Sequence, residues 1–462
     1  MAKAMRHLFL FLEGIIETVW IFCEELLGKL FNWLFPSGIP RRKQGVNADF
    51  GSTKKLLSAN HRGFCLSGTK SLSLKDSFQN VVIIGGTGVG KSSIVLLPSL
   101  FRMKGSFVVH DPSGELFAKS AGYLKRKGYT IKTLNFANAK ISDGFNPLAR
   151  LWSTSEVNKV ASLMIRTTLG GTKGDPFWNL QATSLLALLI SLVKADLEVK
   201  HTFFEVRNLL NRLTQDADGV MKRATQPELL TELKSFLAYD DKVKLGIIAT
   251  VASTLQIFTD EDVREVTSYD SLNINSFRSQ PTALFVQNPI TEQAYYAVLS
   301  SIFFEQLFGV LLNRLPSSKE LPVFCLIDEG GVLYLPSLAH TIANIRKYQA
   351  GILLAIQGKS QLVQNYGPFG AETILNNCFA QLYFTGQSGI QATELEQTLG
   401  RYQYEDKKGK THIRPLMTRD EIRTLSKKQA LLLAGNFPPM LLNLIPYYKQ
   451  KPLSIFSQLP YV

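Results

Sequence analysis

Short runs of apolar residues, each bounded by turn-forming residues, recur along the chain from residue 81 onwards. Runs of this kind are typical of strands that are buried on both faces of a parallel sheet. We predict such strands at Val81–Ile84, Phe107–His110, Ile131–Phe136, Ala283–Val286, Val323–Ile327, Ile352–Ile356 and Gln381–Phe384, with a final apolar pair at Ala430–Ala434 and Leu441–Ile445. Helical periodicity fills most of the intervals. The alternation predicts an α/β fold with a mainly parallel sheet and helices on both faces.

The segment between the third and fourth predicted strands departs from this alternation. It shows several long helical patterns and no convincing strand, for example at Trp178–Lys194, Phe203–Leu213 and Pro227–Ala238. We therefore predict an all-α domain at residues 149–276. It would be inserted into a core that consists of residues 36–148 and 277–462.

The first 35 residues carry a third pattern, in which charges interrupt the apolar residues from Leu8 to Phe35. On a helical wheel the apolar residues take one side, and the other side holds Glu13, Glu17, Glu24, Glu25 and Lys29. A transmembrane span needs about 20 mostly uncharged residues, and a secretory signal needs a charge-free core. The pattern therefore predicts an amphipathic helix at residues 1–35. Because Arg41, Arg42 and Lys43 follow it, we expect residues 8–35 to bind a membrane or a membrane subunit; packing on the globular body is the alternative.

The first predicted strand runs directly into a glycine-rich loop. Residues 85–92 read G-G-T-G-V-G-K-S, which matches G-x-x-x-x-G-K-[ST], and the helical run Ser93–Phe101 follows. Glycines allow successive backbone N–H groups to point at a phosphate, and the helix N-terminus adds its positive end. We expect the phosphates of ATP to be bound by Gly85, Gly86, Thr87, Gly88, Val89, Gly90, Lys91, Ser92 and Ser93. Lys91 would reach the β- and γ-phosphates, and Ser92 would ligate Mg²⁺.

The strand Val323–Ile327 ends in two carboxylates, Asp328 and Glu329. Ligands bind at the carboxyl ends of the strands in open α/β sheets. We expect Asp328 to hold Mg²⁺ through water and Glu329 to polarise the attacking water, so the pair predicts hydrolysis rather than binding alone. An acidic residue after a strand is often only a helix cap. The upstream phosphate loop favours the catalytic interpretation.

Two further polar residues are candidates for catalysis. Gln357 ends the strand Ile352–Ile356, where its amide would contact the γ-phosphate or the water; a solvated strand end is the alternative. Arg346 and Lys347 lie on a predicted helical run, Ser337–Tyr348. An arginine that reaches a neighbouring subunit's nucleotide accelerates phosphoryl transfer by about 10³ to 10⁵. A solvated helix charge explains Arg346 equally well.

Composition narrows the partner and the compartment. The 462 residues are 45% hydrophobic, enough for a sizeable core, and 51 Lys and Arg against 37 Asp and Glu give a net charge of +14. This balance favours a polyanionic partner, either nucleic acid or acidic lipid. The four cysteines are Cys23, Cys65, Cys325 and Cys378. They lack the spacing of a zinc site or a disulfide framework, which indicates a reducing compartment.

Further short motifs occur in order along the chain: Asp111–Leu116, Phe145–Leu148, Asp175–Trp178, Ser360–Leu362, Thr373–Cys378 and Arg414–Thr418. Together with the phosphate loop and the Asp328-Glu329 pair, their order and spacing resemble the coupling proteins of type IV secretion and conjugation, the TraG/TraD family. The resemblance covers approximately residues 63–447. The chain departs from the family pattern at two places. Ser113 stands where many members have Lys. Members also usually begin with two transmembrane helices, whereas this chain has one predicted amphipathic segment.

The resemblance implies a RecA-like nucleotide-binding domain with an inserted all-α domain, assembled as homo-hexamers around a central channel. It also implies ATP-driven delivery of single-stranded DNA, with its attached relaxase, to type IV secretion channel proteins. The location it implies is the cytoplasmic face of the bacterial inner membrane. By position, Lys91, Ser92, Asp328, Glu329 and Gln357 match the ATP site. Arg346 is the nearest match to an arginine that acts in trans.

Three other functions remain open at the level of sequence. They are a motor for protein cargo or channel assembly, a double-strand DNA translocase, and a docking receptor controlled by nucleotide. Glu329 argues against the receptor, because a receptor does not need sustained hydrolysis. Several basic clusters would either contact phosphates or form solvated faces: Lys125–Lys127, Lys407, Lys408, Lys410, Lys427 and Lys428.

Overall fold

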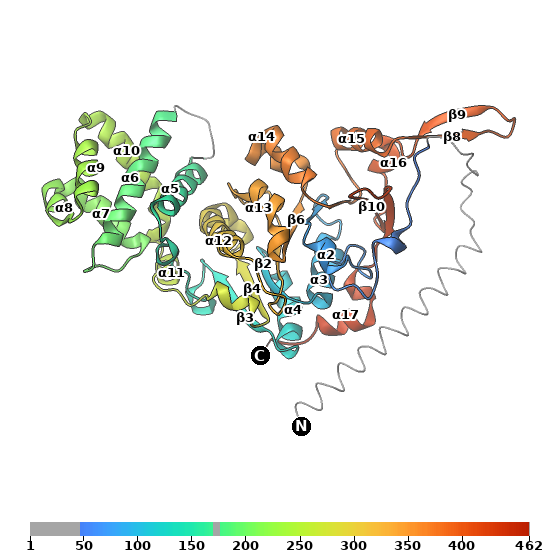
Figure 1. Ribbon diagram of the computed structural model, residues 1–462, viewed down its shortest axis with the longest axis horizontal. Helices are drawn as coiled ribbons and strands as arrows, with labels where there is room; N and C mark the ends of the chain where they lie inside the picture. The colour runs from blue at the N-terminus through green and yellow to red at the C-terminus, as the bar shows by residue number, and fades with distance from the viewer. Residues whose placement is uncertain (1–46, 170–175, 462) are drawn as a thin grey trace, which may run out of the picture.

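The computed structural model describes residues 47–169 and 176–461. The predicted amphipathic helix at residues 1–35 lies outside the described residues. Figure 1 shows an elongated molecule with a central sheet, a helical lobe at one end and a projecting hairpin at the other.

Nine strands form one sheet in the order β11-β10-β7-β1-β6-β5-β2-β4-β3. The seven strands from β3 to β7 in this order are parallel, and β10 and β11 are antiparallel to their neighbours. The predicted strands all appear, as β1 Val81–Ile84, β2 Ser106–His110, β3 Thr130–Asn135, β4 Thr282–Gln287, β5 Val323–Ile327, β6 Ala350–Ile356, β7 Ala380–Tyr383, β10 Gln429–Ala434 and β11 Met440–Asn443. The α/β fold class is therefore confirmed.

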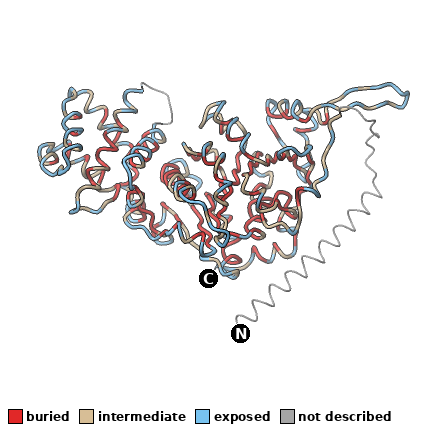
Figure 2. Tube along the Cα trace, in the orientation of Figure 1, coloured by how far each residue is buried: buried red, intermediate tan, exposed pale blue. Residues whose placement is uncertain are grey.

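Helices cover both faces of this sheet, because alternate residues of each strand point to opposite sides. On one face, Val82, Val108 and Cys325 pack with α12 Gln293–Asn313, α13 Leu338–Asn344 and α14 Lys359–Asn376. On the other face, Val81, Phe107 and Leu326 pack with α3 Leu97–Arg102, α4 Glu115–Arg126 and α17 Lys451–Phe456. Figure 2 shows that the buried residues concentrate in the strands and in the helices against them.

Shorter elements complete the core. Helix α2 Leu74–Ser77 precedes β1, and a helical segment, η2 Ser92–Leu96, joins the glycine-rich loop to α3. Helices α15 Gly389–Leu399 and α16 Arg419–Arg423 lie beside each other near β10 (Figure 1). The predicted helix at Ser337–Tyr348 is divided into α13 and a tighter turn, η8 Ile345–Tyr348.

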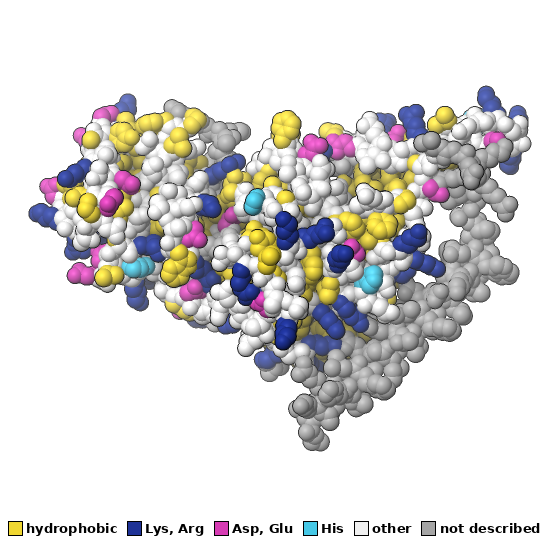
Figure 3. Space-filling view, viewed as in Figure 1, with side chains coloured by type: hydrophobic (Ala, Val, Ile, Leu, Met, Phe, Trp, Pro, Cys, Tyr) yellow, Lys and Arg dark blue, Asp and Glu magenta, His cyan; other side chains and the backbone are white. Residues whose placement is uncertain are grey.

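A two-stranded hairpin, β8 Arg401–Glu405 and β9 Thr411–Pro415, stands apart from the main sheet. The sequence had indicated a basic cluster at Lys407, Lys408 and Lys410 and a motif at Arg414–Thr418, but no strand here. The hairpin projects from the body in Figure 1, and Figure 3 shows dark blue basic side chains at its far end. Its residues alternate between exposed and half-buried, so neither strand has the fully buried run by which the core strands are recognised.

Between β3 and β4 the described residues form helices and no strand. The helices are α5 Thr154–Thr168, α6 Pro176–Ala195, α7 Phe203–Gln215, α8 Ala217–Arg223, α9 Pro227–Leu237, α10 Asp241–Thr254 and α11 Glu261–Val266. They form the helical lobe of Figure 1. The all-helical character agrees with the prediction, and the division at residues 149 and 276 stays a prediction.

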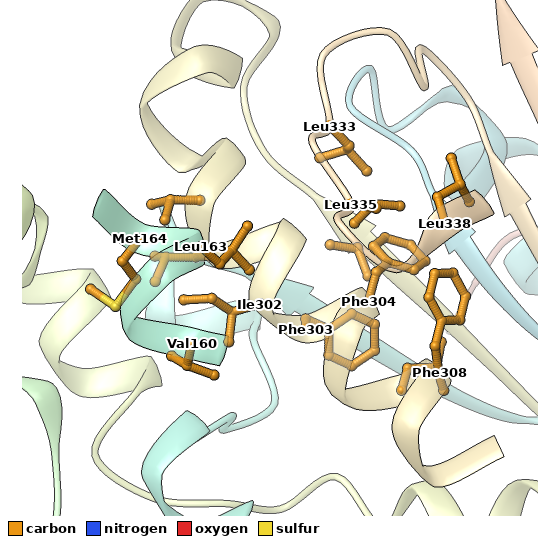
Figure 4. Packing of buried hydrophobic residues seen from close by; sticks show 14 of the residues in the cluster. Val160, Leu163, Met164, Ile302, Phe303, Phe304, Phe308, Leu333, Leu335 and Leu338 are labelled. Atoms are coloured by element: carbon orange, nitrogen blue, oxygen red, sulfur yellow. The ribbon is translucent and has the colours of Figure 1, made fainter. Parts of the chain in front are cut away.

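The helical lobe shares a hydrophobic core with one face of the sheet. Val160, Leu163 and Met164 of α5 pack towards Ile302 and Phe303 of α12 (Figure 4). Two helices among the described residues are long and apolar enough to cross a membrane, α6 and the segment Ile290–Asn313 that contains α12. Core helices meet the same criterion, and half or more of each apolar window is buried inside the protein, which indicates packing.

Candidate functional site

The glycine-rich loop follows the carboxyl end of β1, which lies between β7 and β6 in the sheet. Gly88 and Gly90 have φ angles of 76° and 98°, a region that favours glycine because it lacks a Cβ. A Cβ added at Gly86 or Gly88 would meet no heavy atom of the described chain within 4 Å. This geometry fits a phosphate-binding loop, which needs room for a ligand close to its backbone N–H groups.

Lys91 ends the loop with its side chain almost fully buried. Its Nζ donates hydrogen bonds to the carbonyl oxygens of Gly85, at 2.6 Å, and Gly86, at 3.0 Å. Burial lowers the pKa of Lys91, and the carboxylates of Glu329 and Asp328 oppose that shift. The ammonium group therefore lies beside both the loop and the acidic pair, where a lysine can neutralise phosphate oxygens.

Ser92 and Asp328 meet across the site although they come from different elements. The Ser92 hydroxyl donates a hydrogen bond of 3.3 Å to Oδ2 of Asp328. Burial, with help from the charge of Glu329, raises the pKa of Asp328 to about 6, and Lys91 opposes the shift. The two oxygens are close enough to serve one octahedral Mg²⁺ ion, which Ser92 would ligate directly and Asp328 would hold through a water.

Glu329 and Gln357 meet at the ends of the neighbouring strands β5 and β6. Nε2 of Gln357 donates a hydrogen bond of 2.9 Å to Oε2 of Glu329. The φ angle of Glu329 is 54°, an uncommon left-handed conformation for a residue other than glycine, and such outliers concentrate at functional sites. The strand order thus brings together Glu329, which was predicted to polarise the water, and Gln357, which was predicted to contact the γ-phosphate or the water.

Helix α14 holds this pair through residues to which sequence reasoning had assigned no role. Oε1 of Gln361 accepts a hydrogen bond of 2.8 Å from the backbone N–H of Gln357. Nδ2 of Asn365 donates to the carbonyl oxygens of Gly331, at 2.9 Å, and Leu333, at 3.3 Å. Gln361 and Asn365 are four residues apart and so share one helix face. Polar residues at that spacing, directly after Gln357, were the available signal.

His110 and Asp111 support the site from β2. A buried ring nitrogen of His110, Nδ1, lies 2.6 Å from the backbone oxygen of Asp328, and because a carbonyl only accepts, Nδ1 donates. Burial lowers the pKa of His110 to about 4, so the ring stays neutral. The carboxylate of Asp111 accepts from the backbone N–H groups of Leu116 and Phe117, which anchors the start of α4.

Arg346 does not join the site of its own chain. It lies on η8, before β6, whereas the phosphate loop lies beyond the carboxyl end of the adjacent β1. The seven residues of β6 span about 23 Å. The exposed guanidinium donates to Oε1 of Gln79, and both residues line a cavity of about 440 Å³ at the amino edge of the sheet. Action of Arg346 in trans stays a prediction.

Comparison with protein families gives a match along nearly the whole chain. Residues 38–459 match the family described as type IV secretory system conjugative DNA transfer. The chain belongs to this family. The resemblance to type IV coupling proteins that the motifs indicated is thereby confirmed.

Curated relatives in this family are distant in sequence. The chain is 20% identical over 402 residues to protein VirD4 of Rhizobium radiobacter, covering 80% of this chain and 57% of the relative. It is 24% identical over 331 residues to the conjugal transfer protein TraG of Escherichia coli, covering 66% of this chain and 52% of the relative. The chain thus spans little more than half the length of these relatives.

Solved structures of the conjugative coupling protein TrwB have the same fold. The unbound monoclinic form of TrwBdeltaN70 matches with a TM-score of 0.69 at 19% identity, covering 88% of this chain and 95% of the solved chain. TrwB in complex with ADP and Mg²⁺ matches with a TM-score of 0.67 at 19% identity, covering 89% and 96%. The mostly parallel sheet is consistent with a RecA-like core.

Proposed function

We propose that this chain is an ATP-hydrolysing coupling protein that drives single-stranded DNA, or a relaxase–DNA complex, into a type IV secretion channel. The observation that carries the hydrolytic part is the assembly of Glu329 and Gln357 beside Asp328, Ser92 and Lys91. A site that only bound nucleotide would not need a carboxylate held by an amide next to the metal-binding pair. Family membership and the TrwB complexes with ADP and Mg²⁺ and with an ATP analogue support the nucleotide.

Each residue of the site has one task in this proposal. Gly86 to Ser93 bind the phosphates through backbone N–H groups, and Lys91 neutralises the β- and γ-phosphates. Gly85 joins this loop to the sheet, because its N–H donates to the carbonyl of Ile356. Ser92 and Asp328 hold Mg²⁺, which supplies charge neutralisation at the phosphate oxygens. Glu329 orients and polarises the attacking water, and Gln357 fixes the Glu329 carboxylate by donating to it. His110 keeps the backbone at Asp328 in place.

The assembly and the location belong to the same proposal. The protein would form a homo-hexamer, and Arg346 would complete the site of the neighbouring subunit. The helices of residues 149–276 would meet the cargo, and residues 8–35 would attach the chain to the cytoplasmic face of the inner membrane or to a membrane subunit. The net charge of +14 supports DNA or an anionic surface as a partner.

ATPase measurements with and without single-stranded DNA test the proposal. We expect Mg²⁺-dependent phosphate release that single-stranded DNA stimulates, and its loss in Lys91→Ala and Glu329→Gln, with Glu329→Gln still binding nucleotide. A Lys91→Ala protein with unchanged turnover would overturn the site. If single-stranded DNA leaves the rate of phosphate release unchanged but a protein substrate raises it, the chain is a motor for protein cargo. Binding without turnover would make it a docking receptor.

A further inference from the structure

The tip of the β8–β9 hairpin has a defined shape. The backbone N–H of Asp406 donates to the carbonyl of Lys410 at 2.9 Å, and Gly409, with a φ of 78°, provides the left-handed residue that such turns need. The Asp406 carboxylate accepts from the backbone N–H groups of Lys408 and Lys410 and from Nε2 of His412. The acidic group of the turn is therefore used to shape it.

The same tip presents positive charge to the outside. Lys407, Lys408 and Lys410 are exposed, and none of them forms an ion pair with a residue in 47–169 or 176–461. Ile413 of β9, three residues from Lys410, is 68% exposed. A cluster of three unpaired cations with an apolar side chain nearby suits a surface that combines anionic groups and hydrocarbon.

The hairpin lies where the chain enters the described structure. The backbone N–H of Ala48 donates to the carbonyl of Arg401 at 2.9 Å, and Oδ1 of Asn47 accepts from the N–H of Gln403 at 3.0 Å. Eleven residues, 36–46, separate this point from the predicted amphipathic helix. Eleven residues reach at most about 40 Å, and a strand of five residues extends about 17 Å. A surface that binds residues 8–35 is thus within reach of the tip.

The sequence of residues 8–35 explains why such a second contact is needed. Their polar face carries Glu13, Glu17, Glu24 and Glu25, which anionic lipid repels. Stable attachment of a protein to a membrane takes two signals, for example an apolar insertion and a polybasic patch. The apolar signal lies in residues 8–35, whose polar face carries four glutamates and one lysine, and a basic cluster lies at the hairpin tip.

We infer that the tip of β8–β9 is a docking surface for the headgroups of anionic phospholipids. Lys407, Lys408 and Lys410 contact the phosphates, and the hairpin fixes the orientation of the nucleotide-binding core relative to the bilayer. The inference rests on the membrane location proposed above and does not depend on ATP hydrolysis. Because each lysine near an anionic surface strengthens binding roughly fivefold, the three together account for about a hundredfold.

Vesicle flotation of the full-length chain tests this surface. The vesicles are phosphatidylcholine alone, or phosphatidylcholine with about a third of phosphatidylglycerol. A triple variant, Lys407→Glu with Lys408→Glu and Lys410→Glu, should lose at least a hundredfold in binding to the anionic vesicles and little on the neutral ones. The corresponding triple Arg variant should keep the parent's binding, because it keeps the charge.

A matched control carries the same charge change on the helical lobe, where Lys222, Lys234 and Lys242 are exposed. Their triple Glu variant should bind anionic vesicles like the parent. Equal losses in both variants, or unchanged binding of the hairpin variant, would overturn the docking surface. A hairpin variant that keeps vesicle binding but no longer binds single-stranded DNA would show that the tip contacts DNA. A hairpin variant that keeps vesicle binding but forms smaller oligomers in mass photometry would show that the tip contacts the next subunit. A parent chain that binds neither vesicle would overturn the docking surface and leave attachment through a membrane subunit as the route to the membrane.

Discussion

Gly331 is the position at which a single methyl group tests the link between α14 and the proposed catalytic pair. A Cβ added there would lie 2.3 Å from Cδ, 2.5 Å from Nε2 and 2.6 Å from Oε1 of Gln361. The φ angle of Gly331 is outside the left-handed region, so alanine suits the backbone. Gly331→Ala should therefore move the Gln361 amide and break its hydrogen bond to the N–H of Gln357.

The expected effect follows from that one hydrogen bond. Its loss costs about 0.5 to 1.5 kcal/mol. If the bond serves to hold Gln357 against Glu329 during hydrolysis, the loss appears in the activation barrier and lowers kcat roughly 2- to 10-fold. The displaced atoms are the end of a flexible side chain, so thermal stability should change little. The phosphate loop is untouched, so the Kd for nucleotide should stay at the parent's value.

Steady-state ATPase kinetics and a fluorescent-nucleotide Kd measure both quantities. Gly309→Ala in α12 is the control, because a Cβ there meets open space and the residue is exposed. Adding Gln361→Ala to Gly331→Ala removes the clash, so the double variant should be no slower than Gln361→Ala alone. A Gly331→Ala protein with the parent's kcat, or with kcat and nucleotide affinity reduced equally, would refute the reasoning.

Three further predictions concern the hydrophobic core, the buried thiols and the proposed homo-hexamer. Phe304→Ala empties a fully buried site on α12 and should lower the free energy of unfolding in urea by about 3 to 5 kcal/mol; a loss below about 1 kcal/mol would contradict the packing. Burial raises the pKa of Cys325 and Cys378 to about 12 and also raises that of Cys65. Because the thiolate is the reactive form, iodoacetamide at pH 8 should label these three only after unfolding, as read by mass spectrometry; native labelling would contradict their burial. If Arg346 acts in trans, an equal mixture of Arg346→Ala and Lys91→Ala subunits should regain about a quarter of the parent ATPase rate, since one interface in four is intact. A mixture no faster than its components would contradict that role.

The core strands were predictable because burial on both faces leaves an uninterrupted apolar run. Each predicted strand lies within two residues of the observed one at both ends, for example Ile352–Ile356 against β6 Ala350–Ile356. The β8–β9 hairpin was missed for the opposite physical reason. Neither strand has a fully buried face, and Tyr402 and Tyr404 are only half-buried. In β9 the apolar Ile413 is exposed, so no buried apolar run marks the hairpin.

The proximity of the site residues was predictable in part. Asp328 and Gln357 follow strands that are neighbours in the sheet, and a shared edge brings their side chains together. The spacing of Gln361 and Asn365 indicated a shared helix face, but the hydrogen bond from Gln357 to Gln361 also depends on a side-chain rotamer, which spacing does not determine. The position of Arg346 had a signal in the sequence, because a residue that precedes a parallel strand lies at the edge opposite the ligand site. Only action across a subunit interface can therefore bring it to ATP.

Helix α12 gives the proposed coupling between hydrolysis and cargo a physical route. Its Glu305 accepts a hydrogen bond of 3.0 Å from the N–H of Ser337, at the end of the loop that begins at Glu329. Phe304 packs beside Leu335 of that loop, whereas Ile302 faces α5 of the helical lobe (Figure 4). Close packing transmits displacement instead of absorbing it. In the proposed mechanism, a shift of the loop after Glu329 would therefore press on α12, and α12 would pass it to α5 through Ile302.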